Sequence, residues 1–434
     1  MPEEPRAALA LFLERSHTAA PLQLPQLVDE AARRLGMVSA TVYLADVQEN
    51  LLVPLPGPGA GDNAPALTVE GTVAGWAYRT MSLRLSRQPL AVWLPLVDGI
   101  ARIGVLQIVA DQITSAILDG ATQLAAVTAL TVVSKSGFSG LLSRAARRRP
   151  MTTAAEMVWA FLPPRTLGTD KVTSTAVLEP AYDVGGDASD HGLDDGRLHL
   201  TVVDAMGHDL AAGLASAVAL AGCRATRRAG GTLTDITARI DEDLHHWRPG
   251  GLLTGVFAYL DLDTGHLSWI NAGHPPPLLI RAHHVVAGAL EAHGELPLGL
   301  GPGYQPSRTV HQAQLQPGDR ILIHTDGVTE ARSATGRQFG ENQLVDLVTR
   351  ALAAGEPAPK PCAASSTPSS TTTTASYRTT PPSSWPNGIP RPNPPTMINL
   401  SVDRSTPTTR GQAPSATTLL TPTMGPASHG WESR

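Results

Sequence analysis

Three aspartates at turns flanked by glycine constrain the fold of this chain more than any other feature. Asp187 closes a Gly-Gly-Asp turn, Asp204 ends the apolar run that includes 202–203, and Asp326 precedes a glycine after a further apolar run. Apolar runs that end at such turns predict strands whose ends carry a carboxylate. Carboxylates held at strand ends, where glycines let backbone carbonyls approach, suit hard divalent cations. The pattern predicts a metal-dependent hydrolase.

The segments around these aspartates follow one another in a characteristic order. Residues from about 162 to 352 resemble the SpoIIE/RsbU-like serine phosphatases of sigma-factor signalling, the bacterial branch of the metal-dependent PP2C (PPM) phosphatases. The motifs that carry the resemblance are Phe161–Pro164, Val184–Asp190, Asp204–His208, Asn271–Pro277, Pro317–Arg320 and Thr325–Ala331. One such motif could arise by chance, whereas six in family order are specific.

The chain is predicted to be an α+β protein with more than one domain, because 434 residues exceed what one core usually holds. Residues 1–140 combine an amphipathic helix, which includes Leu27 and Ala31, with a hairpin turning at Asp98 and Gly99. This order of elements resembles a GAF sensor domain. Trp76, Tyr78 and Trp93 could line a ligand pocket there, but such aromatics more often belong to the core, and we favour the core.

Residues 141–165 are predicted to form a helical linker and 166–355 the phosphatase-like domain. Within the latter, antiparallel hairpins are expected around 197–203 and 256–270, with two helices between them. The resemblance implies that these elements build a layered α-β-β-α sandwich. It also implies that the metals lie at one edge, between the two sheets.

The resemblance further implies a ligand set for two Mn²⁺ or Mg²⁺ ions. Asp187 and Asp204 would hold the pair, the Ala205 carbonyl would be a neutral ligand, and Asp326 would complete the second ion's shell. A water bridging the ions would attack the phosphorus of a phosphoserine in line. Asp190 either binds metal through water or only supports its loop, and both alternatives stay open.

Two histidines are candidates for proton transfer. His208 could protonate the leaving serine oxygen, because the ordinary pKa of histidine lies near neutral pH. The alternative is that His208 orients a metal ligand and His274 hydrogen-bonds a loop; we favour it, because metal-bound water can also supply the proton. Asn271 and Gly273 are expected to shape the loop beside the site. The resemblance also implies that Gly207, Asn271 and His274 lie with Ala205 among the residues that bind the metal cofactor.

The end of the chain departs from the family pattern. Family members finish with a helix and a strand that carries two adjacent aspartates, one of them a metal ligand, and no such motif follows Asp346. The C-terminal strand is therefore expected to be missing. Residues 356–434 are rich in Ser, Thr and Pro and are predicted to be a disordered tail.

A shift of reading frame would account for this tail. Back-translating Ala363 to Gly388 with G/C-rich codons and reading one base earlier can give the family's terminal helix and its aspartate pair, the latter over Thr379 and Thr380. We interpret the tail as the result of a frameshift near residues 353–362. An independent read of the codons for residues 350–385 tests this: a one-base change that restores the pair supports it, and confirmation of the written frame refutes it.

Charge and cysteine content set limits on partners and location. The net charge of -5 argues against a nucleic-acid partner, and two cysteines argue against a disulfide framework. No apolar stretch is expected to reach the length of a membrane span, so we expect a cytoplasmic protein without a membrane partner. The resemblance implies a phosphorylated anti-sigma-factor antagonist or similar phosphoprotein as substrate, and homodimers formed through the linker helices. The alternatives are a catalytically impaired signalling scaffold and a generic small-molecule phosphatase.

Overall fold

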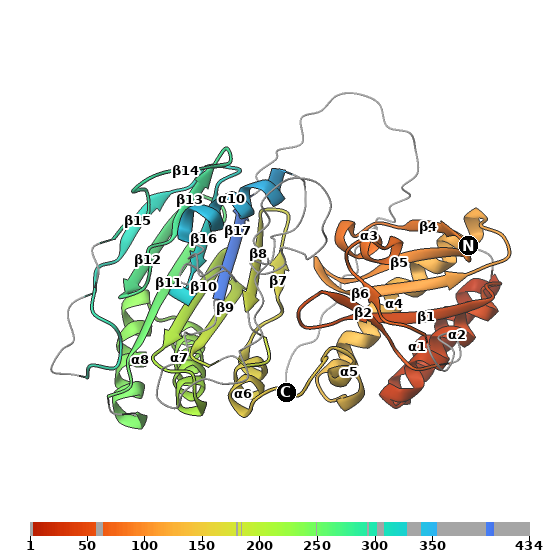
Figure 1. Ribbon diagram of the computed structural model, residues 1–434, viewed down its shortest axis with the longest axis horizontal. Helices are drawn as coiled ribbons and strands as arrows, with labels where there is room; N and C mark the ends of the chain where they lie inside the picture. The colour runs from red at the N-terminus through yellow and green to blue at the C-terminus, as the bar shows by residue number, and fades with distance from the viewer. Residues whose placement is uncertain are drawn as a thin grey trace, which may run out of the picture.

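The computed structural model describes residues 3–57, 64–178, 181–183, 185–248, 250–292, 295–301, 308–327, 340–353 and 396–402. Two folded units lie side by side along the long axis, with a short helical connector between them (Figure 1). The predicted α+β class is confirmed, because each unit packs helices against antiparallel sheets.

The N-terminal unit is built on one antiparallel sheet, here sheet 1, with strand order β3-β2-β1-β6-β5-β4. Its strands are β1 (Ser39–Ala45), β2 (Leu51–Pro54), β3 (Leu67–Thr68), β4 (Arg84–Arg87), β5 (Leu90–Asp98) and β6 (Ala101–Val109). Its helices are α1 (Glu3–Thr18), the 3-10 helix η1 (Pro21–Gln23), α2 (Leu24–Arg34), α3 (Val73–Thr80) and α4 (Ser115–Ser136). The GAF resemblance remains a prediction for this unit.

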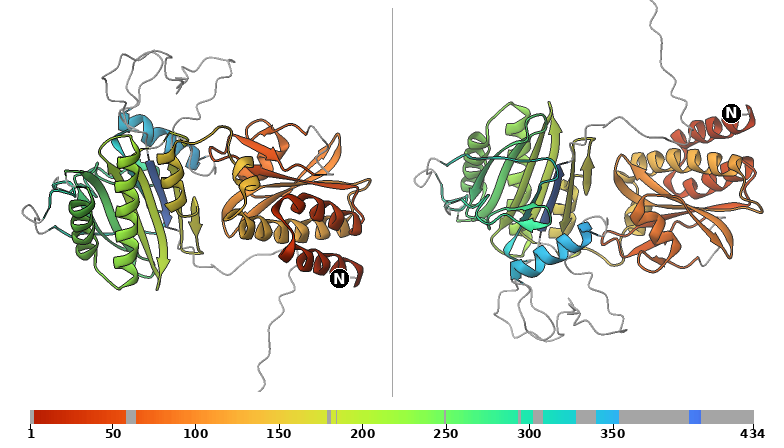
Figure 2. Two further views of the ribbon diagram at one scale, coloured as in Figure 1. Left: turned by 90° about the horizontal axis from the view of Figure 1, so that it is seen from below. Right: turned by 90° about the horizontal axis from the view of Figure 1, so that it is seen from above.

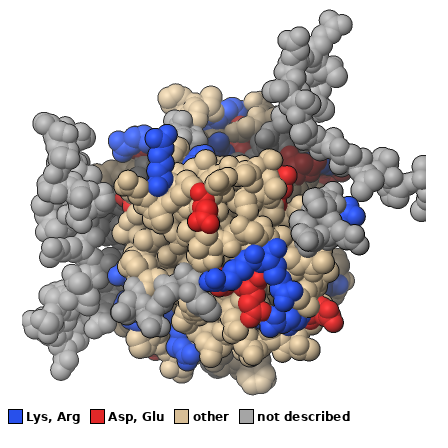
Figure 3. Space-filling view, turned by 90° about the vertical axis from the view of Figure 1, so that its right-hand side faces the viewer, with Lys and Arg blue, Asp and Glu red and all other residues tan. Residues whose placement is uncertain are grey.

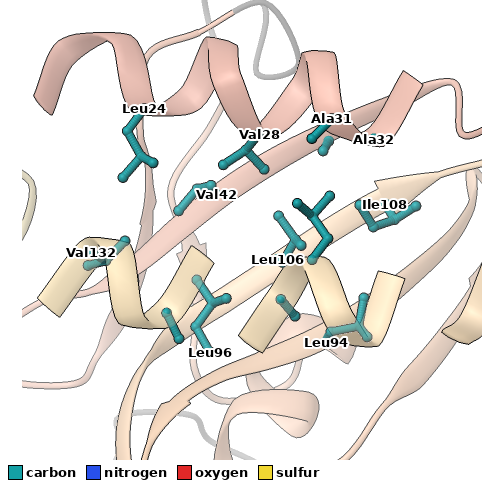
Figure 4. Close-up of a cluster of buried hydrophobic side chains, with 14 of the residues drawn as sticks. Leu24, Val28, Ala31, Ala32, Val42, Leu94, Leu96, Leu106, Ile108 and Val132 are labelled. Atoms are coloured by element: carbon teal, nitrogen blue, oxygen red, sulfur yellow. The ribbon is translucent and has the colours of Figure 1, made fainter. Parts of the chain in front are cut away.

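Helices α1, α2 and α4 cover one face of sheet 1. Leu24, Val28 and Ala31 follow the helical period along α2, so their side chains share the face that meets Val42 and Leu106 of the sheet (Figure 4). Gly36 then ends the helix in a left-handed conformation, with a φ of 81°. The periodicity of the sequence thus accounts for this core.

The aromatic residues of the N-terminal unit belong mostly to a second core on the opposite face of sheet 1. Tyr43, Tyr78 and Trp93 are buried there together with Val105. Trp76 is instead 51% exposed. The core interpretation therefore describes Tyr78 and Trp93, whereas Trp76 lies at the surface.

Helix α4 corrects one expectation. Of the described helices it alone is long and apolar enough to cross a membrane, whereas no such stretch was predicted. Its side chains at Ala121, Leu124, Ala129 and Val132 lie in the core against sheet 1. Core packing is therefore a sufficient reason for its apolar composition.

The end of the N-terminal unit that faces away from the second unit carries scattered charge. On the described part of this face, basic side chains lie in separate groups, several of them next to acidic side chains, and form no continuous basic surface (Figure 3). Arg15 with Glu30 is an exposed ion pair of this unit, whereas Asp29, the partner of Arg33, is buried. An exposed pair such as Arg15–Glu30 contributes little to stability.

The connector contains α5 (Gly140–Ala145) and α6 (Thr153–Phe161). Ser139 and Thr152 cap the two helices, each accepting a hydrogen bond from a backbone N–H in the first turn. Helix α6 then packs against α7 of the second unit. The predicted helical linker is therefore two short helices, and the second of them belongs to the core of the second unit.

The second unit contains two antiparallel sheets. Sheet 2 has the order β15-β12-β11-β10-β9 and contains β9 (Asp187–Asp194), β10 (Arg197–Ala205), β11 (Leu253–Asp261), β12 (His266–Ala272) and β15 (His311–Gln314). Sheet 3 has the order β14-β13-β16-β17-β8-β7 and contains β7 (Thr166–Gly168), β8 (Val172–Leu178), β13 (Leu278–Arg281), β14 (His284–Val285), β16 (Arg320–His324) and β17 (Thr396–Val402). The helices are α7 (Leu210–Arg228), α8 (Leu233–Trp247) and α10 (Gly340–Ala353).

The alternation of side chains along the strands shows the layering. On β16, Ile321 and Ile323 pack in the core between the sheets, whereas Leu322 packs against Leu344 of α10. On the far side, α7 and α8 pack on the outer face of sheet 2. The order of layers is helix, sheet, sheet, helix, as the two further views show (Figure 2). The predicted α-β-β-α sandwich is confirmed.

Strand β17 lies in the middle of sheet 3. It pairs antiparallel with β16 through Leu322↔Asn399 and with β8 through Val172↔Val402. The expectation that the sheet lacks its last strand is therefore corrected, because residues 396–402 of the Ser/Thr/Pro-rich segment take that position. The rest of the segment from 354 lies outside the described residues.

Candidate functional site

Asp187 and Asp204 lie directly opposite each other on neighbouring strands. Asp187 begins β9, Asp204 is the penultimate residue of β10, and the two are partners in the antiparallel register. Directly opposite residues point to the same face of a sheet. Asp187 is fully buried, whereas Asp204 is partly exposed. The two carboxylates are therefore neighbours at the end of sheet 2.

The second sheet contributes Asp326 through its neighbour Thr325. The Thr325 hydroxyl donates a hydrogen bond of 3.0 Å to Asp187 Oδ2, which joins the end of β16 to the start of β9. Asp326 follows at once and is exposed. The three predicted aspartates thus meet at one edge between the sheets, although they come from three segments far apart in the chain.

Burial and neighbouring negative charge dominate the electrostatics of this site. Burial raises the pKa of Asp187 well above its ordinary value, and the carboxylates of Asp204 and Asp326 raise it further. Asp187 Oδ1 is buried without a hydrogen-bond partner among the described residues. A buried acceptor in a cluster of acids is what a cation would satisfy.

The aspartates do not form a closed cage on their own. Among the described residues, no three His, Cys, Asp or Glu side chains are grouped closely enough to hold an ion as they stand. Uncompensated carboxylates repel one another, so a cation would have to draw them together. The chemistry of the donors fits a hard divalent ion, which would complete the site on binding.

Two glycines allow the turn before Asp187 to pack on the turn after Asp204. A Cβ atom on Gly186 would lie 2.0 Å from the Ala205 carbonyl oxygen, and one on Gly185 would lie 2.5 Å from His208 Cα. The Ala205 N–H donates to the Gly186 carbonyl at 3.1 Å. No side chain fits at either position, which explains why the motif requires glycine. The Ala205 carbonyl, predicted as a neutral ligand, lies in this contact.

His208 and Gly207 occupy the turn that leads into α7. Gly207 has a φ of 105°, which favours glycine, and His208 is exposed at the surface. Asp209 caps α7 by accepting a hydrogen bond of 2.9 Å from the Ala212 N–H. Asp209 therefore has a structural role. His208 remains open to solvent beside the site, as a proton donor would need to be.

Asp190 lies on the opposite face of sheet 2 from Asp187, because the two are three residues apart on one strand. Its two carboxylate oxygens accept hydrogen bonds of 2.7 and 3.1 Å from the Arg224 guanidinium of α7. Asp190 is 2% exposed. This ion pair anchors α7 to the sheet, and metal binding by Asp190 stays a prediction.

Asn271 and His274 hold the loop after β12 closed by two hydrogen bonds to each other. The His274 N–H donates to Asn271 Oδ1, and Asn271 Nδ2 donates to the His274 carbonyl, both at 2.8 Å. His274 Nδ1 lies 2.9 Å from the hydroxyl of Thr254, the partner of Asp204 in the register of β10 and β11. Burial and the neighbouring His324 lower the pKa of His274 to about 3. His274 is therefore neutral near pH 7 and holds the loop.

Several residues that support the site were not among the predicted ligands. Thr325, Thr254 and Arg224 make the contacts described above, and the Ser216 hydroxyl of α7 donates to the Gly186 carbonyl. Thr325 stands next to a predicted ligand, so adjacency was a usable signal. The other three lie on elements whose approach to the site depends on the tertiary fold, and no local pattern marks them.

Part of the second unit matches a known protein family. Residues 194–365 match the family described as Stage II sporulation protein E (SpoIIE). Over 98 residues the chain is 33% identical to Protein IcfG of Synechocystis sp. (strain ATCC 27184 / PCC 6803 / Kazusa), which covers 22% of this chain. The chain spans only 14% of the length of that relative.

Solved structures of low sequence identity align with the chain. The RsbU and RsbW domains of Rv1364c from Mycobacterium tuberculosis align with 24% identity and a TM-score of 0.40, covering 55% of this chain and 61% of that one. The SiaA-PP2C domain of Pseudomonas aeruginosa aligns with 18% identity and a TM-score of 0.43, covering 58% of this chain and 94% of that one. The matched family segment includes Asp204 and Asp326 and begins after Asp187, so the place of Asp187 rests on the geometry alone.

Proposed function

We propose that this chain, whose residues 194–365 form a PP2C-type domain of the SpoIIE family, is a metal-dependent protein serine/threonine phosphatase. Its proposed substrate is phosphoserine on a signalling protein such as an anti-sigma-factor antagonist. One observation carries the proposal: Asp187 and Asp204 are opposed on sheet 2, and Thr325 ties Asp187 to the strand end that bears Asp326. The family match supports the reaction class, and the substrate is inferred from the sigma-factor signalling of the family.

Asp187, Asp204 and Asp326 would hold Mn²⁺ or Mg²⁺, two ions in the family resemblance. When bound, the ions would neutralise a phosphate dianion and activate water. The chain's own residues supply the remainder: Thr325 fixes the orientation of the Asp187 carboxylate, and the Gly185–Gly186 turn brings the Ala205 carbonyl close. His208 is exposed at the rim and could deliver a proton to the leaving oxygen.

Phosphate release by the purified chain tests the proposal. We expect turnover of a phosphoserine peptide and of p-nitrophenyl phosphate that requires added Mn²⁺ and ends with EDTA. Asp326→Ala should lower it by about a hundredfold or more, because a carboxylate of the proposed ligand set is lost at an exposed position. Asp263→Ala, which removes an exposed carboxylate in the turn between β11 and β12, is the control and should keep full activity.

The alternatives predict other outcomes of the same assay. A signalling scaffold would give no turnover of either compound by the wild type and would still bind its partner. A generic small-molecule phosphatase would hydrolyse p-nitrophenyl phosphate with no preference for a phosphoprotein. Unchanged activity in Asp326→Ala would remove the aspartate site from the mechanism altogether.

A further inference from the structure

One turn of the N-terminal unit contacts the connector near both of its ends. It joins β1 to β2, and its Val47 N–H donates a hydrogen bond of 2.7 Å to the Ala146 carbonyl, just after α5. Glu49 Oε1 in the same turn lies 3.2 Å from Arg165 Nη1, immediately before β7. Asp46 Oδ1 fixes the turn by accepting hydrogen bonds from the backbone N–H groups of residues 50 and 51. The connector is therefore held at its start and at its end by one short segment.

Glu49 forms ion pairs with two arginines, and all three side chains are largely shielded from solvent. Its other oxygen, Oε2, lies 3.1 Å from Arg102 Nη2 of β6. The side chains of Arg102, Glu49 and Arg165 are 9%, 15% and 24% exposed. Water and salt screen charges at this depth less than they screen charges at the surface. Loss of the Glu49 charge would therefore leave the charges of the two arginines uncompensated. Glu49 also adopts a φ of 49°, which a residue other than glycine seldom takes.

The connector in turn holds the residues that lead into the aspartate site. The backbone N–H of Arg148 donates to the Tyr182 hydroxyl at 2.8 Å, and the Thr152 N–H donates to the Tyr182 carbonyl at 3.1 Å. Trp159 Nε1 of α6 donates to the Ala181 carbonyl at 2.7 Å. Residues 181–182 stand only a few residues before Asp187, so the connector holds the segment that precedes the Gly-Gly-Asp turn.

A second set of contacts joins the end of the connector to β9 itself. His191 Nε2 lies 2.7 Å from the Pro164 carbonyl, and His191 Nδ1 lies 2.8 Å from the Ser174 hydroxyl of β8. Arg224, which holds Asp190, also donates to the Phe161 carbonyl at 2.6 Å. Pro164 directly precedes Arg165, the residue that Glu49 holds. The contacts therefore run without a break from the N-terminal turn to the strand that begins with Asp187.

We infer that the turn Asp46–Asn50 is a positioning element for the metal site, acting through Arg165 and the connector. While Glu49 holds Arg165, the Asp187 turn is kept opposite Asp204 and beside Thr325. A ligand or partner that displaces the β1–β2 turn would release the connector and loosen the site. The catalytic readout of this inference rests on the proposed function. The β1–β2 turn is then the point at which the N-terminal unit controls the phosphatase unit.

Glu49→Gln in the full chain tests the inference. It keeps the shape of the side chain and removes its charge. We expect the Mn²⁺ concentration for half-maximal p-nitrophenyl phosphate turnover to rise about five- to tenfold, within the range of ordinary coupling between sites. KM for p-nitrophenyl phosphate, measured at saturating Mn²⁺, should change less than twofold. The matched control is Glu30→Gln, because Glu30 also forms an ion pair, with Arg15, but on the N-terminal unit alone.

A double variant separates the contact from general destabilisation. If Glu49 acts through Arg165, Glu49→Gln combined with Arg165→Gln should shift the Mn²⁺ requirement no further than the larger single change. Additive effects would mean that the two residues act separately, and they would overturn the inference. An equal shift in Glu30→Gln would also overturn it, because any weakened ion pair would then suffice.

Hydrogen exchange gives a readout that does not depend on activity. In Glu49→Gln the backbone N–H groups of residues 181–192 should exchange faster than in the wild type, whereas Glu30→Gln should leave them unchanged. Changes confined to residues 46–51 would overturn the inference. If the wild type releases no phosphate, the proposed function fails, and the exchange of residues 181–192 still decides whether the turn positions them.

Discussion

Replacing Asp187 with Asn is expected to lower Mn²⁺-dependent phosphate release by about a thousandfold and, at the same time, to stabilise the metal-free protein. The activity falls because the buried carboxylate with the unpartnered oxygen is lost from the ligand set. The stability rises because Asn is neutral and does not repel Asp204 and Asp326. Steady-state kinetics and thermal unfolding, each with Mn²⁺ and with EDTA, measure the two effects.

The pH dependence of stability follows from the same group. Asp187 has a folded-state pKa raised above its ordinary value of 3.8. The folded protein therefore retains a proton that the unfolded chain releases, and the metal-free stability should fall as pH rises from about 4 through the raised pKa. Asp187→Asn should remove this loss. A metal-free wild type whose stability is flat or rises over that interval would contradict the assignment.

Asp190→Asn is the matched contrast, because Asp190 lies on the same strand but on the other face. It should destabilise the metal-free protein, by about 3 kcal/mol, since it leaves Arg224 without its carboxylate partner. The two substitutions are thus expected to have opposite signs in one unfolding experiment. Equal signs would show that the two faces of β9 have been misassigned.

Replacing Ile398 with Pro is expected to destabilise the second unit by about 3 kcal/mol or more. Ile398 pairs with Ile323 on one side and with Ala176 on the other. In a strand with neighbours on both sides, every N–H points toward one of them, so proline removes a hydrogen bond of the sheet wherever it is placed. Urea unfolding followed by circular dichroism measures the loss.

Ile398→Val is the control for this substitution, because it keeps the N–H and the β-branched side chain. It should unfold close to the wild type, while the N-terminal unit should be unaffected by either change. If Ile398→Pro unfolds at the wild-type urea concentration, β17 is not a strand of sheet 3 in solution. The position between β8 and β16 would then be open to the aspartate-bearing strand that a shifted reading frame encodes.

Local sequence patterns account for the strands and for the residues at their ends. They do not account for contacts between residues that are far apart in the sequence. The apolar run before Asp204 and the Gly-Gly turn before Asp187 predicted two strand ends with carboxylates. That Asp190 turns away from Asp187 follows from the strand period once β9 is known to begin at Asp187. Its partner Arg224 could not be predicted, because the pairing depends on how α7 lies on sheet 2.

The position of β17 could not be predicted for a related reason. Residues 396–402 differ from the rest of the tail only in a few apolar residues, among them Ile398 and Leu400, which flank Asn399. The periodicity of so short a run does not by itself identify a strand. The segment forms a strand because it pairs with both β8 and β16, and this pairing depends on the assembled sheet.

The place of β17 also orders events during synthesis. The N-terminal unit is complete in sequence once α5 has been made, whereas sheet 3 lacks an inner strand until residue 402 leaves the ribosome. At ordinary elongation rates, the residues between β16 and β17 take several seconds to make. Throughout that interval, the facing edges of β8 and β16 have unpaired N–H and C=O groups that another chain could bind. The N-terminal unit can therefore fold while its chain is still being made, but the second unit must wait, and this interval is when crowded nascent chains are most prone to aggregate.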